Sequence, residues 1–291
     1  MSYLNQPAKF SEALNRLKAK KEIAALLSSK QWQEVPAAIR DRAFFSSRVT
    51  SARFLTKAKK LMKDFVNKKR EEVTTPEGEK EVAIKVGGRA NFVEMMQNFL
   101  IDEGLEFFFG DSLSPEAPKG QRGAIPETRD LASPRRLGLI FDTNIRAAYG
   151  YGNFIASTDP DVIDVFPAWR FVRGGYVKTP RPLHKKYENA VRRKDDTAFW
   201  LEMNKREIGG FGVPHGPWGF NSQMMVIDVD RNEAMKLGLI KKDEKIKEPR
   251  SEFNKALSVD LSRMDKGVVA RLKKAFGKSI KTKGKTLAWT K

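Results

Sequence analysis

Apolar residues recur at helical spacing through most of the first third of the sequence. In residues 37–65 they fall at steps of three and four, which places them on one helix face. Residues 69–86 differ, because short polar and apolar alternations flank a Pro-Glu-Gly turn, a pattern typical of a β-hairpin or a flexible arm. We predict a helical N-terminal region over residues 1–110, with a hairpin or arm near residues 70–86.

Proline, glycine and serine then interrupt the periodic pattern. They are frequent in residues 111–133, where we expect a linker or a long loop. Ser133 followed by Pro134 is a favourable start for a helix, since serine caps the first turn and proline fits the first helical position. Apolar residues at helical spacing follow, and they predict a long helix over residues 135–154.

Shorter patterns follow the long helix. Residues 167–184 predict a strand, a Gly-Gly turn and a second strand. Residues 224–229 alternate as a strand does, and Asp230 can cap a helix over residues 231–237. We therefore expect a central domain over residues 134–241 that combines a long helix with small antiparallel β elements.

Positive charge marks the end of the chain. Val269, Leu272 and Phe276 give one apolar face to a basic helix. Residues 266–291 hold nine lysine or arginine residues and no aspartate or glutamate. We expect residues 242–291 to form a basic helix and a tail that is either disordered or ordered by a partner. The chain as a whole is predicted to be an α+β fold, mainly α.

The charge balance is the strongest signal in the composition. The 291 residues include 55 Lys and Arg against 36 Asp and Glu, which gives a net charge of +19. Such a balance attracts phosphate backbones or acidic protein surfaces. Cysteine is absent, which excludes disulfides, cysteine nucleophiles and thiolate zinc sites. No run approaches the roughly 20 apolar residues of a membrane span, so we expect no membrane partner and synthesis in the cytosol.

Two histidines are the obvious candidates for catalysis. His184 and His215, together with Asp195 or Asp196, would supply ordinary metal ligands. They are not spaced as a metal motif on one helix, and no HExxH sequence is present. We therefore expect each histidine to fix a loop by a hydrogen bond, and we expect no metal, no cofactor and no catalytic residue.

Other polar and aromatic residues of the central region have structural interpretations. Asp142 and Arg146 lie four residues apart and can pair across a helix turn. Trp169, Trp200 and Trp218 are of a type that stacks on nucleic-acid bases. Each of them stands beside apolar residues, so core packing is the favoured interpretation.

The central region carries six groups of residues in a set order: Asp-Thr-Asn in an apolar helix, Trp-Arg, Arg-Pro-x-His, Phe-Trp, a loop of Pro, Gly and Trp around His215, and a final strand and helix. In this order residues 131–239 resemble the Mu gpF-like phage head morphogenesis family, which comprises minor head proteins of tailed phages and prophages. The matching residues are Asp142, Thr143, Asn144, Arg146, Trp169, Arg170, Arg181, Pro182, His184, Phe199, Trp200, Pro214, Gly216, Trp218 and Gly219.

The resemblance implies a structural or assembly role in the virion, near the portal or with the packaged genome, and no catalysis in this region. The family often carries two cysteines just after the Trp-Gly pair, at positions where this chain has Phe220 and Ser222. If those cysteines and a histidine hold a metal elsewhere in the family, this chain has lost that site.

We expect a structural or assembly protein of a tailed-phage head, a minor head protein present in several copies, that packs on the portal or capsid. It would lie in the virion, at the head or the head–tail junction, and in the host cytoplasm during assembly. Its basic end is expected to meet double-stranded DNA or an acidic protein surface through Lys273, Lys274, Lys278, Lys281, Lys283 and Lys285.

Two alternatives stay open at this point. The first is a metal-dependent hydrolase or nuclease that uses His184 and His215, and it predicts a cleft that holds an ion beside those residues. The second is a general DNA-binding protein with no role in the virion, and it predicts that purified particles do not contain the chain.

Overall fold

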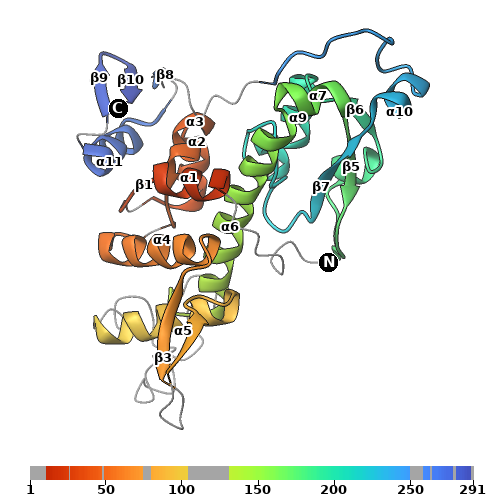
Figure 1. The fold of residues 1–291 in the computed structure, drawn as a ribbon. Helices are drawn as coiled ribbons and strands as arrows, with labels where there is room; N and C mark the ends of the chain where they lie inside the picture. Colours follow the sequence, from red (N-terminus) through yellow and green to blue (C-terminus); the bar gives the residue numbers. More distant parts are fainter. Residues whose placement is uncertain are drawn as a thin grey trace.

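The computed structural model of the chain shows helices packed along one long helix, with small sheets around it (Figure 1). It describes residues 11–25, 27–47, 49–74, 80–103, 131–249, 258–262, 264–277 and 280–289. The predicted α+β fold, mainly α, is confirmed. Within these residues no helix is both long enough and apolar enough to cross a membrane.

The long helix is α6 (Pro134–Ser157), drawn in green in Figure 1. It begins where the sequence predicts, because the hydroxyl of Ser133 accepts a hydrogen bond from the amide of Arg136 at 3.2 Å. Its 24 residues extend over about 36 Å. The first half of α6 packs in a helical core, and the second half faces a sheet. One element therefore positions both parts of the molecule.

The first half of α6 shares its core with three other helices. These are α1 (Ser11–Ala19), α4 (Ala52–Val66) and α5 (Arg89–Asp102). The ring of Phe141 on α6 lies 5.1 Å from the ring of Phe65 on α4. Each helix turns one apolar face to this core, and removal of these faces from water stabilises the packing.

The predicted helix over residues 37–65 is interrupted in the structure. Ser51 caps a new helix, α4, by accepting a hydrogen bond from the amide of Phe54 at 3.1 Å. The buried Phe44 continues the apolar pattern across the break. Helical spacing alone therefore did not reveal that the helix is interrupted. The elements before α4 are α2 (Ser29–Glu34), α3 (Ala37–Arg42) and two short strands that pair in parallel, β1 (Lys21–Glu22) and β2 (Ala43–Phe44).

The predicted hairpin is confirmed. Strands β3 (Arg70–Thr74) and β4 (Lys80–Ile84) pair in antiparallel register along their whole length. The hairpin runs past α5 toward the lower end of the molecule in Figure 1. It is thus an arm that leaves the helical core rather than a part of a larger sheet.

The division of the chain into four segments stays a prediction. As far as residue 130, the linker expected over residues 111–133 lies outside the described residues. Leu131 and Ala132, which follow, are buried in the helical core. The chain therefore enters α6 from within that core.

An antiparallel three-stranded sheet faces the second half of α6. Strand β5 (Ala168–Arg173) lies in the middle, between β6 (Val191–Arg193) and β7 (Met224–Val229). The predicted strand over residues 224–229 is therefore confirmed, and it forms one edge of the sheet. The helices around the sheet are α7 (Pro160–Val165), α8 (Pro182–Lys186), α9 (Thr197–Met203) and α10 (Arg231–Lys236), with a 3-10 turn at Arg206–Ile208.

The second strand predicted within residues 167–184 is wrong. After β5 the chain runs on without pairing back and enters α8, while the partners of β5 come from farther along the sequence. Pro180 and Pro182 explain the difference, because neither has an amide hydrogen for a sheet ladder. Pro182 also stands at the first position of α8, which favours a helix there.

The C-terminal segment differs from the expected tail. Helix α11 (Lys266–Phe276) covers the residues predicted to be helical. The residues after it form β9 (Ile280–Lys283) and β10 (Thr286–Trp289), and β10 lies between β9 and β8 (Ser258–Asp260). Where the structure describes it, this segment is thus a small α+β unit.

This C-terminal unit is ordered because it shares a core with the N-terminal helices. Leu272 of α11 and Leu287 of β10 are fully buried, in one cluster with Ile23, Val35 and Ile39. A short basic segment has too few apolar residues for a core of its own. The partner that orders it is the beginning of the same chain, which no local sequence pattern could indicate.

Gly150 lets another backbone come close to α6. A methyl group at this position would stand 2.1 Å from the carbonyl oxygen of Gly216, in the loop before β7. Atoms cannot approach so closely, and both partners belong to the backbone. The absence of a side chain at Gly150 therefore sets the distance between α6 and this loop.

We expect Gly150→Ala to lower the free energy of unfolding by about 2 kcal/mol, although alanine in a helix is usually favoured over glycine by about 1 kcal/mol. Gly138→Ala on the same helix is the control. There the three atoms nearest to the added methyl group belong to the guanidinium group of Arg89. This flexible side chain can move away from Asp142, and an exposed ion pair contributes little, so a change within about 1 kcal/mol is expected. Chemical denaturation followed by circular dichroism measures both, and equal effects would contradict the assignment.

Candidate functional site

Three tryptophans form the aromatic centre beside the sheet. Trp169 comes from β5, Trp200 from α9 and Trp218 from the loop before β7. The ring of Trp200 lies 5.3 Å from that of Trp169 and 5.7 Å from that of Trp218. All three are at most 2% exposed. The structure places them in the core, as predicted, which leaves almost none of their surface for stacking on nucleic-acid bases.

His184 joins three segments beside this centre. From α8 its Nε2–H donates to the carbonyl of Met203 at 2.8 Å, and its Nδ1 lies 3.3 Å from the hydroxyl of Ser222. The same hydroxyl accepts a hydrogen bond from the amide of Met224 at 3.2 Å. Burial lowers the pKa of His184, so the neutral ring fits both contacts. Ser222 stands at one of the two positions where the resembled family often has cysteine. Here its hydroxyl fixes the start of β7 beside His184.

His215 is buried between α6 and the loop before β7. Its Nδ1–H donates to the carbonyl of Gly216 at 2.8 Å, and its ring lies 5.8 Å from Tyr151 and 5.1 Å from Phe154 of α6. Burial lowers the pKa of His215 to about 3, and the positive charge of Arg16 on α1 adds to the effect. The ring is therefore neutral near pH 7 and acts as a spacer between the loop and the helix.

Asn204 holds the loop before β7 in shape. Its side-chain nitrogen lies 3.0, 2.7 and 3.1 Å from the carbonyl oxygens of Val213, His215 and Pro217. Its side-chain oxygen accepts a hydrogen bond from the amide of Phe211 at 2.9 Å. Asn204 is fully buried, and these contacts satisfy its amide group. It escaped prediction because a single asparagine at a helix end carries no spacing signal.

Arg181 ties the start of α8 to the same part of the chain. Its Nε donates to the carbonyl of Ile208 at 2.6 Å, and its Nη2 donates to the carbonyl of Phe220 at 2.9 Å. Both bonds run from a guanidinium group to backbone oxygens of the segment that surrounds Trp218. The predicted Arg-Pro-x-His group and the predicted Pro/Gly/Trp loop are thus brought together.

Asp142 and Arg146, which the sequence allows to pair across a helix turn, do not pair in the structure. Asp142 instead accepts a hydrogen bond from Nε of Arg89 at 3.1 Å, which links α6 to α5. The side chain of Asn144 turns back to the carbonyl of Ile140 at 2.9 Å. Arg146 is half-buried and, among the residues described, has no hydrogen-bond or ion-pair partner. It faces a groove instead.

The candidate metal ligands are engaged in other contacts. Arg193 holds Asp195 by two hydrogen bonds of 2.9 and 2.8 Å. Asp196 caps α9 by accepting a hydrogen bond from the amide of Phe199 at 3.1 Å. Where the structure describes the chain, no three His, Cys, Asp or Glu residues lie close enough together to hold a metal ion.

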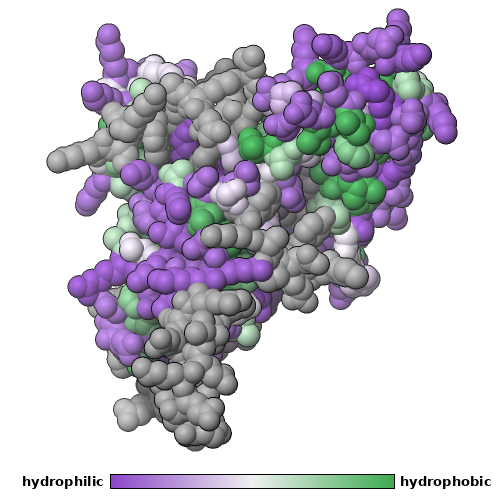
Figure 2. Space-filling model, in the orientation of Figure 1, coloured by the Kyte–Doolittle hydropathy of each residue, from purple (hydrophilic) through white to green (hydrophobic). Residues whose placement is uncertain are grey.

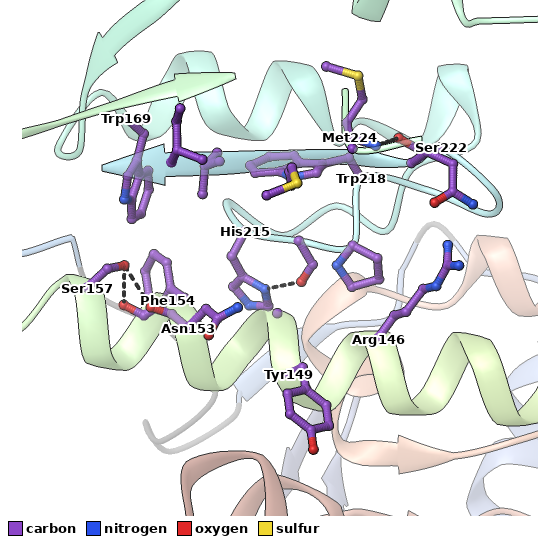
Figure 3. A pocket seen from close by; sticks show the side chains of 18 of the residues that line it. Arg146, Tyr149, Asn153, Phe154, Ser157, Trp169, His215, Trp218, Ser222 and Met224 are labelled. Carbon is purple, nitrogen blue, oxygen red and sulfur yellow. Dashed lines mark hydrogen bonds between the residues drawn. The ribbon is translucent and has the colours of Figure 1, made fainter. Parts of the chain in front are cut away.

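A groove of about 890 Å³ lies between α6 and β7 (Figure 3). One wall is α6, which contributes Arg146, Asn153 and Ser157, and the other is β7 with the loop before it, which contributes Trp218 and Met224. In Figure 3 Arg146 and Ser157 stand at opposite ends of the helical wall. Figure 2 shows apolar side chains gathered over the same part of the molecule. Such a hollow is the default place for a ligand or partner.

A buried ammonium group links the two walls at one end of this groove. Lys194 has no exposed surface, and its Nζ donates to the carbonyl of Ser157 at 2.6 Å and pairs with Asp228 of β7 at 2.7 Å. Burial lowers the pKa of Lys194, while the hydrogen bond to Asp228 opposes that effect. The ion pair therefore fixes the distance between α6 and β7 at this end.

The basic end of the chain presents its lysines to solvent. In β9, Lys281 and Lys283 lie two residues apart and so share one face of the strand, while the buried Ile280 lies on the other. Lys278 lies outside the described residues. The other lysines predicted to meet DNA or an acidic surface are exposed: Lys273, Lys274, Lys281, Lys283 and Lys285.

Comparison with known proteins gives one informative similarity. No protein-family model matches the chain, and no solved structure matches it. Over 71 residues the chain is 38% identical to a protein of Escherichia phage Mu described as "Putative capsid assembly protein F". The similarity covers 24% of this chain and 15% of the phage protein, so it spans less than a sixth of that relative. This partial similarity supports a relationship to phage head assembly.

We expect stability to fall with acid because of His215. Between pH 6.5 and about 3, the unfolded chain binds a proton at this ring and the folded chain does not. Acid therefore favours unfolding, by roughly 1.4 kcal/mol for each pH unit in this window. His215→Asn keeps an N–H donor near the place of Nδ1 but cannot titrate. Denaturation measured from pH 7 to pH 4 should show a shallower loss for the variant, and an unchanged slope would contradict the assignment.

Proposed function

We propose that this chain is a non-enzymatic structural or assembly protein of a phage head, which packs on portal or capsid proteins. The observation that carries the proposal is the 38% identity over 71 residues to a capsid assembly protein of phage Mu. The geometry supports it, because the polar side chains of the central region bind backbone groups and hold loops in place: Arg181, His184, Asn204 and His215.

The proposal assigns no reaction to the two histidines. His184 is 1% exposed and His215 is 4% exposed, and their rings lie against different aromatic residues, Phe171 and Phe154. Each ring donates one N–H to a main-chain carbonyl. Buried polar groups that are hydrogen-bonded in this way usually fix a structure. This arrangement supports a scaffold role for both residues over the hydrolase alternative.

The basic end of the chain is proposed to contact the packaged DNA. Its exposed lysines lie on α11, β9 and the turn before β10, a unit anchored through its core on the N-terminal helices. The charges are therefore held on a folded surface rather than on a free tail. Lysines that meet phosphates position a protein on DNA without reading its sequence, which suits a protein that meets a whole packaged genome.

Purified particles of the phage that encodes this chain are expected to contain it. Mass spectrometry of particles separated on a density gradient measures its presence and its copy number relative to the portal protein. Deletion of the gene should leave particles that are fewer or incomplete, because an assembly component is missing. Absence of the chain from both mature particles and assembly intermediates would instead favour a DNA-binding protein with no role in the virion.

Neutralising the basic end should reduce the salt dependence of DNA binding. In one variant, alanine replaces the five exposed lysines of the basic end: Lys273, Lys274, Lys281, Lys283 and Lys285. This variant should flatten the slope of log affinity against log salt by about 0.9 for each phosphate that a lysine no longer neutralises. The matched control also removes five positive charges, at exposed lysines of the central region, and should keep the slope. Equal slopes for both variants, measured by fluorescence anisotropy, would remove the DNA contact. The control positions are Lys178, Lys185, Lys236, Lys241 and Lys242.

A further inference from the structure

We propose that the groove between α6 and β7 binds an extended segment of another protein of the particle, which adds to the sheet as a strand along the free edge of β7. The proposal rests on the assembly function proposed above and names the form of the partner at one site. It is carried by the hydrogen-bonding pattern of β7, the dimensions of the groove and the charge at its end.

The register of the sheet shows which backbone groups of β7 are free. In an antiparallel pair, residues alternate between bonding to the partner strand and pointing away from it. The amide of Gly174 donates to the carbonyl of Gln223 at 2.8 Å, so Met225 and Ile227, two and four residues on, also bond to β5. The backbone groups of Val226 and of its neighbours two residues away then point outward.

Two contacts confirm this alternation. The amide of Met224 is bound by the hydroxyl of Ser222 at 3.2 Å, which is outside the ladder with β5. On the other side of β5, Phe171 bonds to the backbone of Asn189 and Ala190 rather than to β7. Within the part of the chain that the structure describes, no strand pairs with the outer edge of β7.

The outer edge of β7 lacks the usual protection. Exposed edge strands commonly carry lysine, proline or a bulge that prevents pairing with another chain. Strand β7 has the sequence MMVIDV, and its one charged residue, Asp228, is engaged by Lys194. Ile227 is 43% exposed. Apolar side chains and free backbone groups therefore occur together on an edge that is left open for pairing.

The groove has the dimensions of one extended chain. Along α6, residues 146–157 span about 16 Å, and along β7, residues 224–228 span about 13 Å. Both stretches line the groove, so it holds about five residues of a strand. A slender peptide is therefore the occupant that fits.

The charge at one end favours an acidic residue in the peptide. Arg146 faces the groove at the end away from Ser157 (Figure 3), whose carbonyl accepts the hydrogen bond from Lys194. It has no hydrogen-bond or ion-pair partner in the described ranges. A carboxylate opposite its guanidinium group would form a charge-assisted pair. The expected ligand is an extended segment with apolar side chains at alternate positions and an acidic residue at one end.

The test uses the full chain and two probes. The first probe is a library of random peptides of about twelve residues displayed on filamentous phage, which does not depend on the virion function. The second is a set of overlapping peptides from the portal and major capsid proteins of the same phage. We expect both to yield extended, acidic and apolar peptides with Kd below about 1 mM. Failure of both probes would overturn the proposal.

Amide hydrogen exchange identifies the mode of binding. A peptide that adds as a strand should slow exchange at Val226 and Asp228, whose amides point outward. It should leave Met225 and Ile227 unchanged, because they are already bonded to β5. Uniform slowing along β7, or no change at Val226, would show that the peptide binds in another way and would overturn the proposal.

Variants locate the binding site. Val226→Pro removes an outward N–H at a position where proline is tolerated in an edge strand, and Asn153→Trp fills the groove from an exposed position on α6. Each should weaken peptide binding at least tenfold, about 1.4 kcal/mol. Leu139→Trp, at a partly exposed position of α6 outside the groove, should bind as the wild type does. Unchanged binding by folded Asn153→Trp would overturn the proposal.

Two further outcomes separate this inference from the proposed function. If the chain is present in particles but no peptide binds, the assembly role stands and the groove assignment fails. If random peptides bind as described but the chain is absent from particles, the strand site stands and its partner lies outside the virion. Self-association of the chain that Asn153→Trp abolishes would mean that β7 pairs with a second copy, which contradicts the proposal.

Discussion

The contact between two backbones at Gly150 sets the geometry of the central region. Because no side chain stands between α6 and the carbonyl of Gly216, the loop before β7 lies directly on the helix. His215 and Trp218 can then enter the core from that loop. Strand β7, which follows the loop, then runs beside α6 at a distance that leaves a groove between the two elements.

Buried polar groups reinforce this arrangement. Asn204 binds the loop from inside, Arg181 binds it from α8, and Lys194 joins α6 to β7 at the far end of the groove. A buried polar group that loses its partner costs about 1–3 kcal/mol. Each of these contacts therefore makes other positions of the loop and strand unfavourable. The groove is held open by a network of hydrogen bonds, as a preformed binding site requires.

Charge is distributed unevenly between the interior and the surface. Arg16 of α1 lies over the ring of Tyr151 at 4.1 Å and pairs with Asp41, so a buried cation joins the N-terminal helices to α6. Burial lowers the pKa of Arg16 to about 9. The lysines that the structure describes in the C-terminal unit are instead exposed to solvent. The molecule thus uses some of its excess positive charge inside and exposes another part at its surface.

Local sequence patterns determined the elements whose signals are short-range. The cap at Ser133, the pairing of β3 with β4 and the strand over residues 224–229 follow from preferences that act within a few residues. The burial of Trp169, Trp200 and Trp218 also followed from their apolar neighbours. Periodicity did not predict the break in residues 37–65. A buried apolar residue such as Phe44 continues the apolar spacing whether it lies within a helix or next to one.

Only the tertiary structure decided which distant groups meet. Asp142 pairs with Arg89 rather than with its helical neighbour Arg146, and the basic end packs in one core with the N-terminal helices. The groove depends on Gly150 and Gly216, which are far apart in the sequence and carry no motif together. Such contacts arise from the relative placement of whole elements. Spacing along the chain determines which face of an element is apolar, and packing determines what that face touches.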